Sequence, residues 1–237
     1  MDKVFTKLLY LQKKNYVGLV EGKLYTRGLD YIKTNCLKYA ASLQKDLLEK
    51  ILIKDQRNFQ EIFQKYHDDY YALQISPENL ELFVLHERVT KRPDNYKVPS
   101  TASKVAKWMI ENDILFYPGL MVPIIATGFK DKKMEGCHPD SNLWQGKIDR
   151  DYIWAHQILP KISRIVEPID KDFDSLQFDH YVVQARLRKY KSFQKRLLDT
   201  KLSHELIEKI KEDPTLSRIQ KDELVKFANQ SIGGSLW

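Results

Sequence analysis

The spacing of apolar side chains changes along the first part of the chain. The apolar positions of Asp2–Leu11 are spaced as in a helix that leads into a strand. Beyond them, Val17 and Leu24 flank Glu21–Gly22, where glycine can adopt the positive φ of a tight turn. The pattern predicts a short β-hairpin, and Gly28 predicts a bend where the backbone leaves the sheet.

Two amphipathic helices are predicted next. Apolar residues recur at three- and four-residue intervals through Leu37–Ile51, which places them on one helical face. Asn35 is expected to cap the start of this helix. Asn58 is expected to cap a second helix, whose apolar face runs from Phe59 to Leu73.

The middle of the chain alternates between short strands and a helix. Leu80–Leu85 is mostly apolar and predicts a largely buried strand, and Met121–Ala126 predicts another. Between them, a short helix is expected to start at Ser100 or Thr101. Phe129–Lys147 is polar and irregular, so a loop is expected there.

The rest of the chain reads as helical. Asp149 is expected to cap a long helix that Pro160 should kink. Three further helices are predicted over 173–229, separated near Ser203 and Pro214. The predicted fold class is therefore α+β and mostly helical: a short β-hairpin, followed by a helical region that contains a small sheet.

Composition narrows the class of protein. The 237 residues are 43% hydrophobic and 30% charged, as in a soluble globular protein. No apolar run is long enough for a membrane-spanning helix, and no apolar core follows Met1 as in a signal peptide. Cys36 and Cys137 do not make a disulfide framework. We therefore expect an intracellular protein without a membrane partner, cytoplasmic if its source is prokaryotic.

Charge adds a preference for partners. The formal net charge of +7 favours polyanions, and basic residues are densest in Arg186–Lys201, where Asp199 is the single acid. Aromatic residues interleaved with basic ones suit nucleic acid, although most aromatic side chains are expected in the core.

Lys13-Lys14-Asn15-Tyr16 lies just before the predicted hairpin. A lysine pair is most often a solvated surface pair, but here the flanking sequence adds information. Together with the later step Arg27-Gly28-Leu29-Asp30, the order resembles the late palm of family B DNA polymerases. That family has a Lys-Lys-x-Tyr segment, a short hairpin and a basic-Gly-Leu-acidic step into the thumb.

Two later blocks extend the resemblance to about Ile169. Leu82–Lys91 with Asp94-Asn95-Tyr96 resembles the thumb strand and its basic-to-Tyr segment, and Ile148–Tyr152 begins a block similar to the last core thumb helix. The resemblance implies that residues 1–35 are the C-terminal part of the palm and 36–170 the thumb, with 171–237 a helical extension. It implies DNA contacts by seven residues: Lys13, Lys14, Tyr16, Tyr96, Lys97, Lys104 and Lys107.

The sequence also departs from the family. Lys33-Thr34-Asn35 stands where Arg-Arg-Asp is usual, and Ile153 replaces an aromatic residue. The family motifs that resemble Asp-Thr-Asp, Ser-Leu-Tyr-Pro and Asn-Ser-x-Tyr-Gly are absent. Phosphoryl transfer depends on metal ions that bridge phosphate oxygens. We therefore expect no catalytic residue and no cofactor in this chain, with Mg²⁺ held only in the assembled polymerase.

Two pairs of acids, two cysteines and a histidine are the remaining candidate metal ligands. Asp149 with Asp151, and Asp68 with Asp69, are pairs of a kind more often found at helix starts or on surfaces. Cys36, Cys137 and His138 lack the spacing of a zinc site. No metal site is predicted.

The resemblance implies the small part of a split polymerase, or a fragment, that holds primer–template duplex for DNA replication. The expected partners are the DNA and a larger chain that carries the catalytic aspartates. The tail from Gln230 to Leu236-Trp237 faintly resembles peptides that dock on sliding clamps, although Gly233 replaces an aliphatic anchor. The alternatives are a stand-alone helical nucleic-acid-binding protein and a protein-interaction scaffold.

Overall fold

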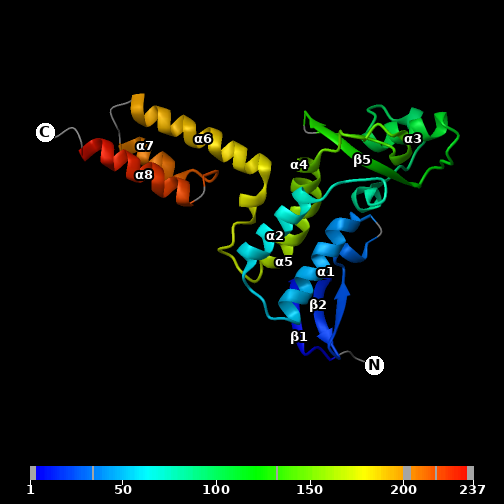
Figure 1. Cartoon of the computed structure of the whole chain (residues 1–237), viewed down its shortest axis with the longest axis horizontal. Coiled ribbons are helices and arrows are strands. Elements are labelled where there is room, and N and C mark those ends of the chain that lie inside the picture. The colour runs from blue at the N-terminus through cyan, green and yellow to red at the C-terminus, as the bar shows by residue number, and fades with distance from the viewer. Residues whose placement is uncertain (1–3, 34, 132, 200–203, 217, 234–237) are drawn as a thin grey trace. The chain divides into compact units, whose positions relative to one another are not determined.

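The structure is a computed structural model that describes residues 4–33, 35–131, 133–199, 204–216 and 218–233. The chain divides into an N-terminal unit, Met1–Phe178, and a C-terminal unit, Asp179–Trp237. Figure 1 shows a small sheet at one end of the N-terminal unit, a second sheet at the other end, and helices between them.

The first sheet is antiparallel with the order β1-β2-β3. Its strands are β1 (Lys7–Gln12), β2 (Asn15–Val20) and β3 (Lys23–Arg27). The β2–β3 hairpin confirms the turn at Glu21–Gly22, where both residues have positive φ. The helix expected at the start of Asp2–Leu11 is wrong for the described residues 4–11, because the chain pairs with β2 from Lys7 onward and its backbone bonds are made across the sheet.

Two amphipathic helices follow the first sheet along the chain. Helix α1 (Lys38–Leu52) and helix α2 (Phe59–Ala72) bury the predicted apolar faces. Val17 and Leu19 on β2 join them in one cluster of buried residues that runs through the N-terminal unit. The N-cap of α1 is Leu37 rather than Asn35.

The second sheet has the order β4-β5-β6 and lies beside helix α3 (Thr101–Glu111). Its strands are β4 (Leu85–Arg88), β5 (Met121–Lys130) and β6 (Lys133–Cys137). Two predictions are corrected here. Leu80–Phe83 is a 3₁₀ turn, so the strand begins later than expected. The expected loop after Phe129 begins instead as the β5–β6 hairpin, because β6 finds a partner in β5.

One continuous helical segment follows the second sheet and passes through the core of the N-terminal unit. It consists of α4 (Arg150–Tyr152), a π-helical segment (Ile153–Ile158) and α5 (Leu159–Val166). Asp149 caps it by accepting from the amide of Tyr152 at 2.8 Å, as predicted. The π-helical segment immediately precedes Pro160, whose ring nitrogen has no N–H to donate to the preceding turn.

The C-terminal unit consists of α6 (His180–Asp199), α7 (His204–Glu212) and α8 (Arg218–Gly233). The three predicted helices and the break at Pro214 are confirmed. Ile207, Ile210, Leu216 and Leu224 form its buried cluster. The other expected break, at Ser203, and the tail residues Leu236-Trp237 lie outside the described residues.

The predicted fold class is confirmed: the chain is α+β, mostly helical, with two small antiparallel sheets. Within the described part of the chain, no helix combines the length and the apolar character needed to cross a membrane.

Candidate nucleic-acid interface

Lys13 and Lys14 form the tight turn between β1 and β2. Both side chains are exposed, and Lys14 has a φ of 69°. The sequence predicts a strand before them and a hairpin after them; the structure pairs that first strand, β1, with β2, so that the two lysines occupy the tip of a first hairpin. Two ammonium groups are therefore presented at one end of a sheet whose inner face is buried.

Asn15 and Gly28 fix the backbone of this turn. In the amide orientation that satisfies its neighbours, the Asn15 nitrogen donates to the carbonyl oxygens of Lys14 at 3.1 Å and Gly28 at 2.9 Å. Gly28 has a φ of 73°, and a Cβ built there would lie 2.3 Å from the Lys14 carbonyl oxygen. A glycine is required for this approach, so the bend predicted at Gly28 also locks the lysine turn in place.

A polar joint connects the exit from the sheet to the helices. Asp30 accepts from the ammonium group of Lys33 at 2.6 Å and from the guanidinium group of Arg164 on α5 at 3.3 Å. Gln44 on α1 is buried and donates to the carbonyl oxygen of Lys161 at 2.7 Å. These contacts tie the first sheet, α1 and α5 together directly behind the lysine turn.

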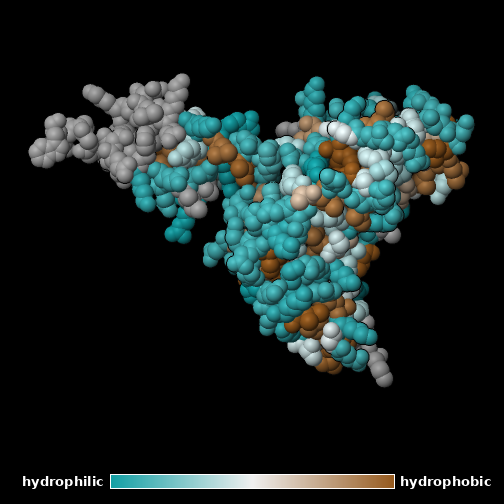
Figure 2. Space-filling model, viewed as in Figure 1, coloured by the Kyte–Doolittle hydropathy of each residue, from teal (hydrophilic) through white to brown (hydrophobic). Residues whose placement is uncertain are grey.

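Tyr16 lies on the outer face of the sheet in an aromatic cluster. Its ring contacts Phe5 edge to face, with 6.0 Å between centroids, and Phe5 also contacts Tyr25 at 5.8 Å. On the same face, edge strand β1 exposes Leu8 (55%) and Tyr10 (60%). Figure 2 shows apolar residues at the surface of this end of the N-terminal unit.

Tyr96 and Lys97 lie in the segment between β4 and α3, and α3 is at the opposite end of the N-terminal unit from β1 and β2 (Figure 1). The Tyr96 hydroxyl oxygen accepts from the amides of Thr90 at 3.2 Å and Lys91 at 3.3 Å. These hydrogen bonds lower the pKa of Tyr96. Tyr96 therefore holds the basic segment after β4 in place, while Lys97 is exposed beside it.

Lys104 and Lys107 project from the exposed side of α3. Ser100 caps the helix by accepting from the amide of Ser103 at 3.1 Å, and four apolar residues bury the opposite face. Lys107 lies 4.0 Å from Glu111, one turn on. The predicted interface residues therefore form two groups, one at each end of the N-terminal unit, rather than one cluster.

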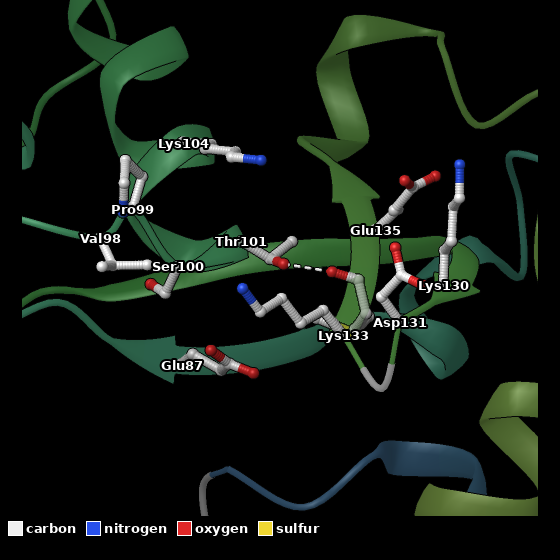
Figure 3. Close-up of a pocket in the computed structure, with 11 residues that line it drawn as sticks. Glu87, Val98, Pro99, Ser100, Thr101, Lys104, Lys130, Asp131, Lys133 and Glu135 are labelled. Atoms are coloured by element: carbon white, nitrogen blue, oxygen red, sulfur yellow. Dashed lines mark hydrogen bonds between the residues drawn. The ribbon is translucent and has the colours of Figure 1, made fainter.

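Lys104 of the second group lines a depression of about 650 Å³ between α3 and the β5–β6 hairpin. Lys104, Lys130 and Lys133 line it together with three carboxylates (Figure 3). One of these is Glu87, whose pKa is raised because the surrounding atoms partly desolvate the carboxylate. The mixed charge of the lining of the depression does not create a strong anion site.

Lys130 and Lys133 were not singled out by the sequence analysis. They flank the tip of the β5–β6 hairpin, inside the segment expected to be a loop. Two apolar residues in that segment, Phe129 and Met134, are paired across the hairpin. They are the feature of the sequence from which this hairpin could have been predicted.

The acids considered as metal ligands have structural roles. Asp149 caps α4, and Asp151 accepts from the hydroxyl of Tyr71 at 2.7 Å. Burial raises the pKa of Tyr71, so it remains a hydrogen-bond donor. Arg150 donates to the carbonyl oxygens of Tyr70 and Leu73, and thereby joins α4 to α2.

The other carboxylate pair is also locally engaged. Asp68 accepts from Gln64 at 2.9 Å, and Asp69 pairs with Lys65 at 2.9 Å. Among the described residues, no group of three or more His, Cys, Asp or Glu side chains is arranged to hold a metal ion.

Comparisons with known proteins give the family. The model of DNA polymerase family B matches residues 1–169. The DNA polymerase of Archaeoglobus fulgidus is 22% identical over 184 residues, which cover 70% of this chain and 23% of the relative. That of Thermococcus aggregans is 27% identical over 173 residues, covering 71% and 9% respectively.

A solved structure agrees in fold. The family B DNA polymerase from the hyperthermophilic archaeon Pyrobaculum calidifontis matches 70% of this chain and 22% of its own, with a TM-score of 0.52 and 20% identity. The chain belongs to DNA polymerase family B. It spans 9–23% of the length of the two curated relatives, and the family match ends before the C-terminal unit begins.

Proposed function

We propose that this chain is the C-terminal palm edge and thumb of a DNA-directed DNA polymerase that serves DNA replication. Its palm part is 1–35, its thumb is 36–170, and it holds the primer–template duplex. The observation that carries the proposal is the family match over 1–169, which includes the fixed Lys13–Lys14 turn. Because the metal-binding motifs are absent from the 237 residues, the catalytic aspartates and their Mg²⁺ belong to another, larger chain.

The proposed role of the lysine turn follows from the chemistry of DNA. Every base pair presents hydrogen-bond acceptors at its minor-groove edge, so a lysine donor there checks pairing geometry without reading sequence. Lys14 is the residue whose backbone is fixed by Asn15. Tyr16 would support the strand behind it, while Tyr96, Lys97, Lys104 and Lys107 would hold phosphates of the departing duplex.

The outer face of the first sheet would dock on the larger chain. β1 is an edge strand with an unpaired side, and Val4 (80% exposed), Leu8 and Tyr10 carry apolar surface beside it. An open edge next to apolar side chains is a surface that proteins normally cover. An obligate interface of this kind buries more than ~2,000 Å².

The proposal predicts weak duplex binding without sequence preference. The five lysines proposed to contact DNA are divided between the β1–β2 turn and the region around α3, so they do not form one groove-reading surface. We expect the observed binding constant to fall by ~0.9 log unit per log unit of salt for each phosphate contact. Titration of primed duplexes of several sequences at several salt concentrations measures this. Salt-independent or strongly sequence-selective binding would contradict the proposal.

Replacement of Lys14 should separate function from folding. Lys14→Ala removes an exposed side chain, so the free energy of unfolding should change by no more than about 0.5 kcal/mol. A charged hydrogen bond to the primer is worth ~1.5–3 kcal/mol, so primer extension by the assembled enzyme should fall about ten- to 150-fold. Lys13→Ala should act in the same direction.

Lys23→Ala, at the other end of the same sheet, is the matched control for this measurement, because its side chain is also exposed. Normal extension by Lys14→Ala with a lowered melting temperature would assign Lys14 to structure instead.

A further inference from the structure

The C-terminal unit carries a second basic surface, outside the family match. Its 59 residues hold 12 Lys and Arg against 8 Asp and Glu. Part of this charge gathers around a depression of about 610 Å³ along α8 and the end of α7. The depression is lined by Lys211, Arg218, Lys221, Asp222, Val225 and Lys226, four cations against one carboxylate. We call these six residues the cationic depression.

Two of the four cations have a structural reason to be there. The ammonium group of Lys221 donates to the Lys211 carbonyl oxygen at 2.8 Å and so satisfies the C-terminal turn of α7. Lys211 itself lies in that last turn, where a positive charge complements the helix dipole, and pairs with Glu208 at 2.8 Å.

Arg218 and Lys226 have no such reason. Both side chains are exposed, and neither has an ion-pair partner among the described residues. Arg218 is the first residue of α8, where the helix dipole disfavours a cation by ~0.3–1 kcal/mol. A cation at a position that the helix dipole disfavours, and beside other cations, indicates an anionic ligand that offsets this repulsion.

Polar contacts around a buried carboxylate fix the positions of the helices that carry the cationic depression. Asp213, in the turn between α7 and α8, is buried and forms an ion pair with Lys189 of α6 at 2.5 Å. The same carboxylate accepts from the amide of Thr215 at 2.9 Å. These bonds offset the burial of Asp213, and its pKa is lowered. They join all three helices through the turn that precedes α8.

We infer that the cationic depression binds the phosphate backbone of nucleic acid. From Arg218 to Lys226 the axis of α8 rises ~12 Å, which corresponds to roughly three to four phosphate steps along one strand of duplex DNA. The lining contains one apolar residue, Val225, whereas helices that bind anionic membranes also insert an apolar face. The inference takes from the proposed function only that the ligand is nucleic acid.

The test uses the full chain and a fluorescent primed DNA duplex. Arg218→Gln combined with Lys226→Gln removes the two cations that have no structural role. The slope of log binding constant against log salt should fall by about 2, with similar weakening on every duplex sequence. The charge-matched control is Lys65→Gln with Lys209→Gln, both exposed residues outside the depression. The control should leave the slope within about 0.5 of wild type.

Three outcomes would overturn the inference. The first is an unchanged slope in the double variant, with helicity measured by circular dichroism equal to wild type. The second is an equal fall in slope for the control, which would show that net charge alone matters. The third is binding to phosphatidylserine vesicles that Arg218→Gln/Lys226→Gln abolishes while DNA binding stays normal.

A further variant separates this inference from the proposed function. If Lys104→Gln with Lys107→Gln weakens DNA binding and the C-terminal double variant does not, the thumb proposal stands and the inference fails. If only the C-terminal double variant weakens binding, the inference stands and the thumb contacts fail.

Discussion

Primer extension is expected to be undetectable when this chain is incubated alone with Mg²⁺, deoxynucleotides and primed template. It should appear when the chain that carries the catalytic aspartates is added. Nucleotidyl transfer needs two metal ions held at the primer end, and the 237 residues contain none of the family's metal-binding motifs. The measurement is incorporation of labelled nucleotide by each chain separately and by the mixture.

Hydrogen exchange tests whether the larger chain covers β1 in the mixture. Amides of β1 (Lys7–Gln12) should exchange rapidly in the lone chain, because β1 is an edge strand with largely exposed side chains. They should become protected in the mixture. Extension by the lone chain, or full protection of β1 without a partner, would contradict the split-polymerase proposal.

A matched pair of variants locates the docking surface. Leu8 on β1 is 55% exposed and Leu143 in a distant loop is 58% exposed, so a lysine at either position should leave folding of the lone chain intact. Leu8→Lys should abolish incorporation by the mixture, because it would bury a charge against the partner. Leu143→Lys should extend primers normally. Equal activities for the two variants would move the interface away from β1.

Gly28→Ala is expected to destabilise the N-terminal unit by about 3 kcal/mol. The position has a φ of 73°, and a Cβ would lie 2.3 Å from the backbone oxygen of Lys14 and 2.0 Å from the Asn15 amide. The left-handed conformation costs ~1–2 kcal/mol, and forced overlap with backbone costs ~1–3 kcal/mol more. Urea unfolding monitored by the fluorescence of buried tryptophans such as Trp154 measures the loss.

Gly22→Ala is the control, because it shares the backbone conformation without the crowding. Gly22 has a φ of 74°, and a Cβ at this position would meet no heavy atom within 4 Å, so its cost should be near ~1–2 kcal/mol. Equal losses for the two variants would show that the approach of Gly28 to the lysine turn has no energetic consequence. Because Lys14 accepts through its carbonyl from Asn15, only Gly28→Ala should also impair extension by the mixture.

The sequence was most informative where structure is local. The periods of α1, α2 and α3 indicated their buried faces, since every third or fourth residue of a helix shares a side. Asp149 was identified as a cap, and Ser100 was one of two candidates for the start of α3, because a short polar side chain can satisfy the free amides of a helix start. The turn at Glu21–Gly22 followed from the conformational freedom of glycine.

The sequence was least informative where a segment depends on a distant partner. Asp2–Leu11 predicts a helix that leads into a strand; the strand is present as β1, but the described residues before it form no helix, because pairing with β2 governs this segment. The polar segment after Phe129 contains β6, whose pairing with β5 turns a weak local pattern into a hairpin. The strand expected at Leu80 starts only at Leu85, where register with Ile124 begins.

For the candidate interface, the sequence by itself determined which residues carry exposed positive charge, and its order of motifs indicated the family that the comparisons confirmed. Only the tertiary structure decided how those charges are grouped. It placed Lys13–Lys14 at the tip of the β1–β2 hairpin and Lys104 and Lys107 on α3, beside the other sheet, and it brought Lys211, Arg218 and Lys226 around one depression. The physical reason is that the residue type at a position fixes the charge of its side chain. The neighbours of that side chain in space are instead set by sheet pairing and helix packing between distant segments.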